Sequence, residues 1–282
     1  MSDRHNQVLN LKSGRTIGFA EYGKVEGYPL IFCHGTPGSR FGHYGLDQFS
    51  LASNIRLIVP ERPGYGLSQP YEWTYRVSGW ASDLKCLLAA LSVERFSIIG
   101  FSNGGAYALA TASAMPDQIE SLTLISSTAP IDNLPTLAGM RPQNLAMLNM
   151  VQNNIAMLRQ QLSGMAKNPE LAYLALRDSY QDVDQQYLNN SHVNRLIRKD
   201  LNTALSAGIN GLIDDLVAYA KPWELDLSSI HVPVDLWHGM ADGNAPMVMA
   251  DYLTQVLPEC TSHLMANEGH ISITQHWSDI LT

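Results

Sequence analysis

The sequence predicts an α/β protein: a mostly parallel central sheet flanked by helices, with a helical segment inserted after the sixth strand. Short apolar runs such as PLIFC, RLIVP and FSIIG alternate with helical patterns over the first half of the chain. Such nearly continuous runs are typical of strands buried on both faces of a parallel sheet. From about residue 132 to residue 221 only helical patterns occur, and strand patterns then return. Strand–helix alternation favours a doubly wound sheet, and the helical block indicates an insertion.

The individual elements follow from these patterns in chain order. Strands are expected at Thr16–Tyr22, Pro29–His34, Arg56–Pro60, Phe96–Phe101, Leu122–Ser126, Val232–Trp237 and Ser262–Met265. Helices are expected at Val77–Leu91, Gly104–Ala114 and Met247–Leu257, with a short helix after His270. The first helix places Trp80, Leu84, Leu87, Leu88 and Leu91 on one face, and the second is small and apolar throughout. Both patterns are expected of helices that pack against a sheet.

The helical block is predicted to form a cap. We expect a core of residues 1–131 and 222–282 and a cap, or lid, of residues 132–221. Helix starts are indicated at Pro142 and Asn168-Pro169, because asparagine caps helices and proline fits the first helical position. Helix breaks are indicated at Gly164, Gly208 and Gly211.

Methionines are concentrated in the predicted cap, at positions 140, 147, 150, 157 and 165. Met147, Met150, Val151 and Leu158 share helical spacing and predict one helix with an apolar face. The first interpretation of this face is packing within the cap. The second is an adaptable apolar wall of a substrate pocket.

Composition and charge restrict the class of protein. Of the 282 residues, 45% are hydrophobic and 16% charged, so a sizeable core can form. The formal charge is −8 and no long run of Lys and Arg occurs, which argues against nucleic acid as a partner. The polar first residues do not resemble a secretory signal, and no run reaches the roughly 18 apolar residues of a membrane span. Cys33, Cys86 and Cys260 form no zinc pattern, so we expect reduced thiols in a cytoplasmic protein.

The most informative pattern is G-x-S-x-G at Gly100-Phe101-Ser102-Asn103-Gly104. It follows a predicted strand and precedes a predicted helix, which is the setting of a nucleophile elbow. The turn is so tight that the serine takes strained backbone angles, and small residues must flank it; Gly100, Gly104 and Gly105 meet this need. The helix N-terminus adds partial positive charge where an oxyanion would form. Ser102 is therefore the predicted nucleophile.

A serine nucleophile needs a base, and His270 is the candidate among nine histidines. It lies in a loop after the last predicted strand, and its imidazole titrates near neutrality. Asp242, in the loop after the strand VPVDLW, is the predicted carboxylate that orients His270. Asp235 and Asp251 lie inside elements and are expected to be structural, and Asp132 is the alternative acid.

The oxyanion hole is predicted from the loop HGTPGS at residues 34–39, which follows the strand LIFC. In a fold with a nucleophile elbow, this loop supplies one main-chain N–H and the residue after the nucleophile supplies the other. Thr36 and Asn103 are the predicted donors. The chain order of oxyanion loop, serine, aspartate and histidine is the one expected of this fold and of no other serine-triad fold.

Together these segments resemble the α/β-hydrolase superfamily over essentially the whole chain. HGTPGS, PERPGYGLS, GFSNGG, HGMADGNAP and NEGH match its signature segments in order and spacing. The resemblance is closest to the capped group of esterases, proline iminopeptidase-like enzymes and carbon–carbon bond hydrolases. Glu61 stands where such loops often begin with aspartate, and its loop is expected to support the oxyanion side. Thr36 stands where peptidase relatives usually carry glycine, which weakens the expectation of aminopeptidase activity. Ser102 argues against the haloalkane-dehalogenase and epoxide-hydrolase branches, whose nucleophile is aspartate.

The resemblance implies a serine hydrolase that cleaves small-molecule carboxylic esters through an acyl-enzyme, with amides or carbon–carbon bonds as alternative targets. Two further classes stay open: a lyase or metal-free perhydrolase on the same triad, and a weakly catalytic ligand receptor. No nucleotide-binding motif and no metal-ligand spacing occurs in the sequence, so neither a cofactor nor a metal is expected. The expected partner is a small-molecule substrate, and no oligomeric state is predicted.

Overall fold

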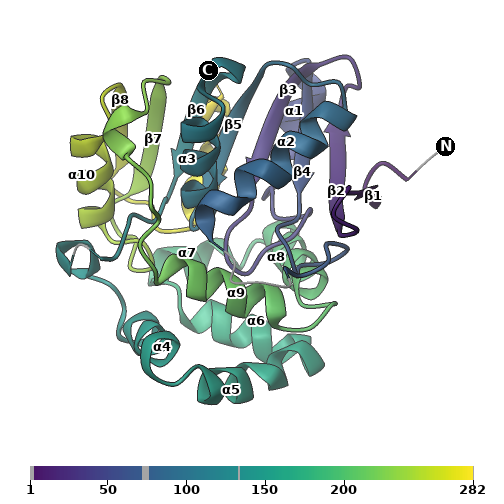
Figure 1. Cartoon of the computed structure of the whole chain (residues 1–282). Helices are drawn as coiled ribbons and strands as arrows, with labels where there is room; N and C mark the ends of the chain where they lie inside the picture. Colours follow the sequence, from purple (N-terminus) through teal and green to yellow (C-terminus); the bar gives the residue numbers. More distant parts are fainter. Residues whose placement is uncertain (1–2, 72–75, 133, 282) are drawn as a thin grey trace.

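An eight-stranded sheet forms the centre of the computed structural model, which describes residues 3–71, 76–132 and 134–281. The strands are β1 (Gln7–Asn10), β2 (Thr16–Gly23), β3 (Tyr28–Cys33), β4 (Ile55–Pro60), β5 (Phe96–Phe101), β6 (Ile119–Ile125), β7 (Val234–Gly239) and β8 (Cys260–Met265). Their order is β1-β2-β4-β3-β5-β6-β7-β8 (Figure 1). β2 pairs antiparallel with β1 and β4, and every pair from β4 to β8 is parallel.

Parallel pairing brings the carboxyl ends of six strands to one edge of the sheet. The register sets Cys33 opposite Gly100, Phe101 opposite Ile125, and Ile125 opposite Trp237. The loops that follow β3, β5, β7 and β8 therefore leave the sheet side by side. This edge is where ligands bind in open α/β sheets.

Helices cover both faces of the sheet. They are α1 (Leu46–Ala52), α2 (Trp80–Ala90), α3 (Gly104–Ala114), α10 (Met247–Val256) and α11 (Trp277–Ile280), with short 3-10 segments η1 (Val77–Gly79), η2 (Pro116–Gln118), η4 (Leu227–Ser229) and η5 (Ser272–His276). Successive side chains of a strand point to opposite faces, so each face has its own core. Ile31 and Ile98 pack with Leu84 of α2 in one core, whereas Phe32 and Ile99 belong to the other.

Between β6 and β7 the chain forms a region of helices that lies beyond one end of the sheet (Figure 1). Its elements are η3 (Leu134–Leu137), α4 (Pro142–Asn153), α5 (Ile155–Lys167), α6 (Pro169–Asp178), α7 (Asp182–Tyr187), α8 (Ser191–Ala204) and α9 (Asn210–Tyr219). Leu158, Leu201 and Leu216 of this region belong to the core that also contains Phe32. The inserted helices therefore pack as part of the main body.

The fold class and all seven predicted strands are confirmed, with ends that differ by up to three residues. Two short elements were not predicted, β1 and α1. Asn168 does cap a helix that starts at Pro169, because its side chain accepts the N–H of Leu171. Two predicted breaks are wrong. Gly164 lies inside α5 on open surface, and Gly211 lies inside α9, where a Cβ would stand 2.6 Å from the carbonyl carbon of Gly64.

The predicted continuous helix from Met147 to Leu158 is also wrong. α4 ends at Asn153, and the side chain of Asn154 accepts a hydrogen bond from the N–H of Met157 at 3.1 Å, which starts α5. Asparagine is a strong N-cap because its side chain satisfies a free N–H of the first helical turn. The apolar spacing continues across this break, so it indicated one helix where the chain forms two.

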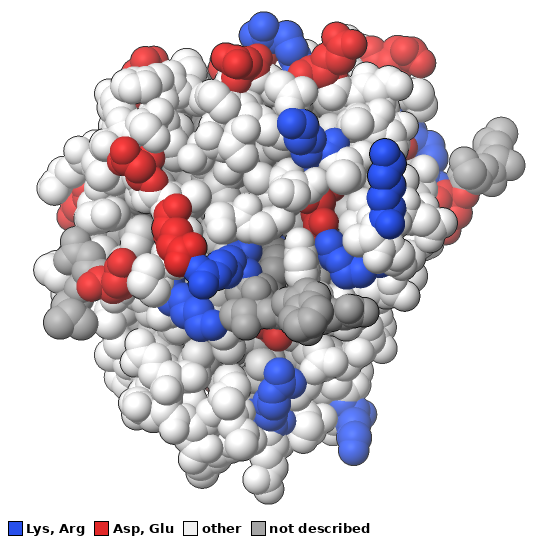
Figure 2. Space-filling view, in the orientation of Figure 1, with Lys and Arg blue, Asp and Glu red and all other residues white. Residues whose placement is uncertain are grey.

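Charged side chains are spread unevenly over the one face of the molecule that Figure 2 shows. On the face in Figure 2, acidic and basic side chains are interspersed over the sheet and its flanking helices, while the inserted helices below carry few charges. Within the described residues, no helix is long and apolar enough to cross a membrane.

Candidate active site

Ser102 lies in the tight turn between β5 and α3, with a left-handed backbone φ of 55°. Its N–H donates to the carbonyl of Ile125 at 2.9 Å, and its carbonyl accepts from Gly105 N–H at 3.0 Å. Small neighbours are required here. A Cβ on Gly100 would stand 2.6 Å from the Cα of Gly105, and one on Gly104 would overlap the carbonyl oxygen of Cys33. The strained geometry directs the serine hydroxyl away from the sheet edge.

The three predicted triad side chains meet at this turn. His270 Nε2 lies 2.9 Å from Ser102 Oγ, and His270 Nδ1 lies 2.7 Å from Asp242 Oδ2. The second oxygen of Asp242 accepts the N–H groups of Asn244 and Ala245 at 2.8 and 2.9 Å. With Asp242 held in this way, neutral His270 carries its proton on Nδ1 and offers a lone pair on Nε2 to the serine hydroxyl.

The loops of Asp242 and His270 meet because β7 and β8 are neighbours in the sheet. The N–H of Met240 donates to the carbonyl of Met265 at 2.9 Å, and that of Ala241 donates to the carbonyl of Glu268 at 2.9 Å. Gly239 permits this approach, since a Cβ there would overlap the carbonyl oxygens of the opposite loop. Main-chain contacts thus fix the spacing between the loops of Asp242 and His270.

A buried carboxylate of the inserted region holds the other side of the histidine loop. Asp184 of α7 accepts three consecutive main-chain N–H groups, those of His270, Ile271 and Ser272, each at 2.9 Å. Gly269 makes room for it, because a Cβ there would overlap the Asp184 carboxylate. Burial lowers the pKa of His270, but the charge and hydrogen bond of Asp242 and the charge of Asp184 outweigh it, so the pKa is raised overall. Two negative groups therefore stabilise the imidazolium form.

The predicted oxyanion donors lie next to each other at the cavity that Ser102 lines. Thr36 and Asn103 both line the cavity at the serine, and among the described residues neither main-chain N–H has an acceptor. Their side chains are joined, because Asn103 Nδ2 donates to Thr36 Oγ1 at 3.0 Å. Thr128 Oγ1 donates in turn to Asn103 Oδ1 at 3.4 Å. The two N–H groups are thus held in a fixed relation to one another.

A buried ion pair supports the loop that carries Thr36. Arg62 donates to the carbonyls of His34 and Gly35, the latter at 2.8 Å, and to both oxygens of Asp215 of α9. Asp215 also accepts the hydroxyl of Thr36 at 2.7 Å and those of two tyrosines, Tyr65 and Tyr107. A buried charge pair is favourable only when its remaining hydrogen bonds are satisfied, as they are here. The inserted region therefore anchors the loop that is predicted to supply an oxyanion donor.

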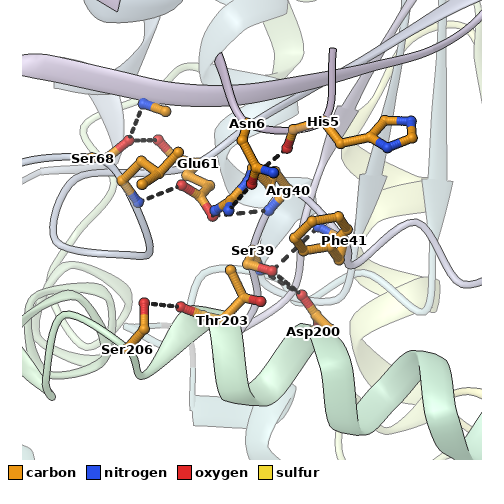
Figure 3. Close-up of polar contacts among 12 residues, drawn as sticks. His5, Asn6, Ser39, Arg40, Phe41, Glu61, Ser68, Asp200, Thr203 and Ser206 are labelled. Carbon is orange, nitrogen blue, oxygen red and sulfur yellow. Dashed lines mark hydrogen bonds and ion pairs between the residues drawn. The ribbon is translucent and has the colours of Figure 1, made fainter. Parts of the chain in front are cut away.

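Glu61, the departure noted at the start of the PERPGYGLS segment, lies in a second buried cluster (Figure 3). Its Oε1 accepts from Arg40 Nη1 at 2.6 Å, and its Oε2 accepts the N–H of Leu67 at 2.7 Å. Arg40 also donates to the carbonyl of His5 and to Asn6. Through Arg40, Glu61 therefore ties the loop before Arg62 to the N-terminal segment.

The other buried histidines near the site are engaged elsewhere. His34 Nδ1 bonds to the carbonyl of Gly35 at 2.8 Å, and its Nε2 accepts the N–H of Arg62 at 3.2 Å. His238 Nε2 bonds to the carbonyl of Ala245 at 2.8 Å. Burial lowers the pKa of both rings, so both stay neutral.

A cavity of about 460 Å³ opens beside Ser102 and His270, between the sheet edge and the inserted helices. Its wall is mostly apolar, and Met140, Met147 and Met165 belong to it. The interpretation of the cap methionines as a pocket wall therefore applies to these three. Met157 is half exposed on the outer surface, and Met150 does not line the cavity.

Four supporting residues were missed by the sequence reasoning: Arg62, Asp184, Asp215 and Asp200. Asp200 of α8 accepts hydrogen bonds from the N–H and the hydroxyl of Ser39, in the loop of Thr36. One of the four carried a signal, because Asp215 interrupts the otherwise apolar helix GLIDDLVAYA, and buried acids are rare unless paired. Asp132, the alternative acid, is exposed on the chain after β6, whereas His270 Nδ1 contacts Asp242. The cysteines are free, with Cys33 buried and Cys86 exposed.

Comparison with known proteins adds a family and several relatives. A family model described as alpha/beta hydrolase fold matches residues 28–276. A 2-hydroxymuconate semialdehyde hydrolase of Pseudomonas putida is 25% identical over 265 residues, covering 89% of this chain and 83% of that protein. A hydrolase from Pseudomonas aeruginosa PA01 superposes with a TM-score of 0.76 at 18% identity, over 98% of this chain and 96% of that one. A bromoperoxidase from Bacillus anthracis superposes with a TM-score of 0.72 at 22% identity, over 98% of this chain and 96% of that one. At identities of 18% and 22%, these two superpositions show that this chain has the same fold as both structures.

Proposed function

The chain belongs to the α/β hydrolase family, and we propose that it is a serine hydrolase that cleaves small-molecule carboxylic esters through an acyl-enzyme on Ser102. The observation that carries the proposal is the continuous set of contacts from Ser102 Oγ to His270 Nε2 at 2.9 Å and from His270 Nδ1 to Asp242 at 2.7 Å, at the wall of an apolar cavity. A hydroxyl within reach of a base that is itself oriented by a carboxylate is the arrangement of an activated nucleophile.

Acylation uses each member of this set. Ser102 Oγ attacks the carbonyl carbon of the ester while His270 Nε2 takes the hydroxyl proton. Asp242 stabilises the imidazolium that forms. The carbonyl oxygen becomes an oxyanion, and the N–H groups of Thr36 and Asn103 donate to it. His270 then protonates the leaving alcohol, and the acyl group stays on Ser102.

The shape and chemistry of the cavity support a neutral, apolar acyl group as the substrate class. Its wall contains the three methionines and several leucines, and among the described lining residues there is no Lys or Arg to pair with a carboxylate. Methionine side chains are flexible and adapt to ligands of different shape. We therefore propose esters of medium-sized apolar acids.

Carbon–carbon bond hydrolysis is the second candidate. The observation that favours it is the match over 89% of the chain to a relative named 2-hydroxymuconate semialdehyde hydrolase. The same serine, base and oxyanion donors would act on a ketone carbonyl in place of an ester. The two candidates are separated by assaying both substrate types with the same preparation.

Two measurements test the proposed function. An organophosphonate probe should form a single adduct on Ser102, located by mass spectrometry, because only an activated hydroxyl reacts. A panel of p-nitrophenyl esters of increasing acyl length should be hydrolysed by the wild type and not by Ser102→Ala. Ser206→Ala is the matched control and should behave as wild type, because Ser206 is an exposed serine two residues after the end of α8, and its hydroxyl donates to the carbonyl of Thr203. An adduct on another residue, or no adduct on folded protein, contradicts the assignment.

A further inference from the structure

A second, smaller compartment lies against the same serine and histidine. Its volume is about 20 Å³, and its wall includes Ser102, His270, Tyr44, Tyr180 and Asp200. Ser102 and His270 also line the large cavity, so the two spaces meet at the reacting groups. A cavity holds one water molecule when the volume available to the centre of that water is roughly 10 to 15 Å³ or more. The compartment therefore fits a single water and no larger ligand.

Asp200 is held rigidly with one oxygen occupied and the other unpaired. Its Oδ1 accepts the N–H of Ser39 at 2.7 Å and the hydroxyl of Ser39 at 2.6 Å, as the two dashed lines from α8 in Figure 3 show. No donor to Oδ2 occurs within residues 3–71, 76–132 and 134–281. Only 3% of the residue is exposed. Burial raises the pKa of Asp200 to about 7, so the carboxylate form is present at and above neutral pH.

The two tyrosines contribute hydroxyls that are likewise unpaired. For the part of the chain that the structure describes, neither Tyr44 nor Tyr180 has a hydrogen-bond partner for its phenol. The ring of Tyr180 stacks on His270, with the ring centroids 6.1 Å apart. The ring of Tyr44 packs on Phe101, with centroids 4.7 Å apart, and Phe101 packs on His270, with centroids 5.3 Å apart. Buried polar groups are almost always hydrogen-bonded, to protein or to ordered water.

We propose that Asp200, Tyr44 and Tyr180 bind the water molecule that cleaves the acyl-enzyme. The inference rests on the proposed function, since it concerns the second half of that reaction. The acyl group occupies the large cavity, and the water lies in the small compartment, whose wall also contains Ser102 and His270. A buried water makes two to four hydrogen bonds, roughly the number of unpaired groups in this wall.

The step balances as follows. The water donates one hydrogen to His270 Nε2 and the other to Asp200 Oδ2. A phenol hydroxyl donates to one lone pair of its oxygen, and the second lone pair attacks the acyl carbon. The bond from that carbon to the water oxygen forms and the bond to Ser102 Oγ breaks. One water proton passes through His270 to Ser102 Oγ, and a carboxylic acid leaves.

The test separates acylation from deacylation in a stopped-flow experiment with p-nitrophenyl acetate. The burst rate constant reports acylation, and the steady-state rate after the burst reports deacylation. In Asp200→Asn the amide oxygen can still accept both Ser39 bonds, but an NH₂ group replaces Oδ2 and cannot accept from the water. We expect deacylation to slow by about 10-fold or more, the effect of one hydrogen bond to the reacting group, with the burst rate constant within about twofold of wild type. Mass spectrometry should show acylated Ser102 accumulating.

Two further variants and a control complete the design. Tyr44→Phe and Tyr180→Phe keep the rings and remove the hydroxyls, and at least one should slow deacylation selectively. These two variants decide the matter if Asp200→Asn does not fold. Asp214→Asn makes the same change on α9, outside the compartment, and should leave both rate constants unchanged.

Each outcome has one interpretation. Parallel loss of both rate constants means that these residues position Ser102 or His270, and overturns the proposal. Unchanged deacylation in the folded variants also overturns it. A wild type that never acylates Ser102 refutes the proposed function itself, which is a distinct result.

Discussion

Replacing Asp184 by asparagine tests how strongly the inserted region controls His270, the proposed catalytic base. The carboxylate of Asp184 accepts the main-chain N–H groups of His270, Ile271 and Ser272 from a fully buried position. An asparagine keeps one oxygen for Ile271 and Ser272 but presents its NH₂ group to the N–H of His270. Two donors then face each other where a hydrogen bond existed.

The expected loss of stability follows from these contacts. A hydrogen bond to a charged group contributes about 1.5–3 kcal/mol, and the two remaining bonds weaken because a neutral oxygen is a poorer acceptor than a carboxylate. We expect the free energy of unfolding to fall by about 3 kcal/mol, which lowers the melting temperature by roughly 6 to 12 °C for a chain of this size.

The pH dependence of activity should change as well. Because the charge of Asp184 helps to raise the pKa of His270, its removal lowers that pKa. Neutral imidazole is the base, so the acidic limb of kcat/KM should move to lower pH. The same raised pKa also makes stability depend on pH. A histidine pKa that is higher in the folded than in the unfolded protein stabilises the fold at pH values below the unfolded-state pKa of about 6.5, and this stabilisation is lost as the pH rises through the folded-state pKa. The part of the stability loss in Asp184→Asn that comes from removing the negative charge near His270 is therefore largest below about pH 6.5.

Thermal melts by circular dichroism and pH–rate profiles on one p-nitrophenyl ester measure both effects. Asp182→Asn is the matched control, because it removes an exposed carboxylate from the same helix. An Asp184→Asn protein that melts with the wild type and keeps the same acidic limb would refute the reasoning.

Three further predictions concern the site and its wall. Asp242→Asn should keep measurable activity while Ser102→Ala falls to background, since in a protease the corresponding losses are on the order of 10⁴-fold and 10⁶-fold. Full activity of Asp242→Asn together with an inactive Asp132→Asn would mean that the acid is misassigned. Met147→Ala should shift the preference toward longer acyl chains by about 10-fold, the discrimination that a methylene-sized change in a pocket gives, while the exposed Met157→Ala should not. Activity should survive exhaustive treatment with EDTA, because the described residues contain no cluster of three metal-ligating side chains; loss that only added zinc reverses would contradict this.

The nucleophile turn could be predicted because all its determinants are contiguous in sequence. The apolar strand, the glycines around Ser102 and the small-residue helix lie within residues 96–114, and the φ of 55° follows from their geometry. Asp242 and His270 were inferred because they follow the last two predicted strands, in the chain order serine, aspartate, histidine. Their distances depend on β7 and β8 being adjacent, which the sheet provides.

The inserted region was predicted as helices, but its internal boundaries were less well defined. Asn154 interrupts a stretch whose apolar spacing is continuous, because periodicity records which side chains face inward and not whether the chain turns between them. Gly164 and Gly211 lie inside helices. A glycine in a helix weakens it by about 1 kcal/mol, which packing can offset, as the close approach of Gly211 to Gly64 illustrates.

By itself the sequence determined the α/β class and the inserted helices, and it predicted Ser102 as the nucleophile, because strand periodicity and turn chemistry are local properties. Only the tertiary structure decided which acids support the site. Asp184, Asp200 and Asp215 come from three different inserted helices, and each bonds to a loop more than 80 residues away, as Asp184 does to His270 at a separation of 86. Helical spacing gives the face on which such a residue lies, whereas its partner depends on how the inserted helices pack over the edge of the sheet.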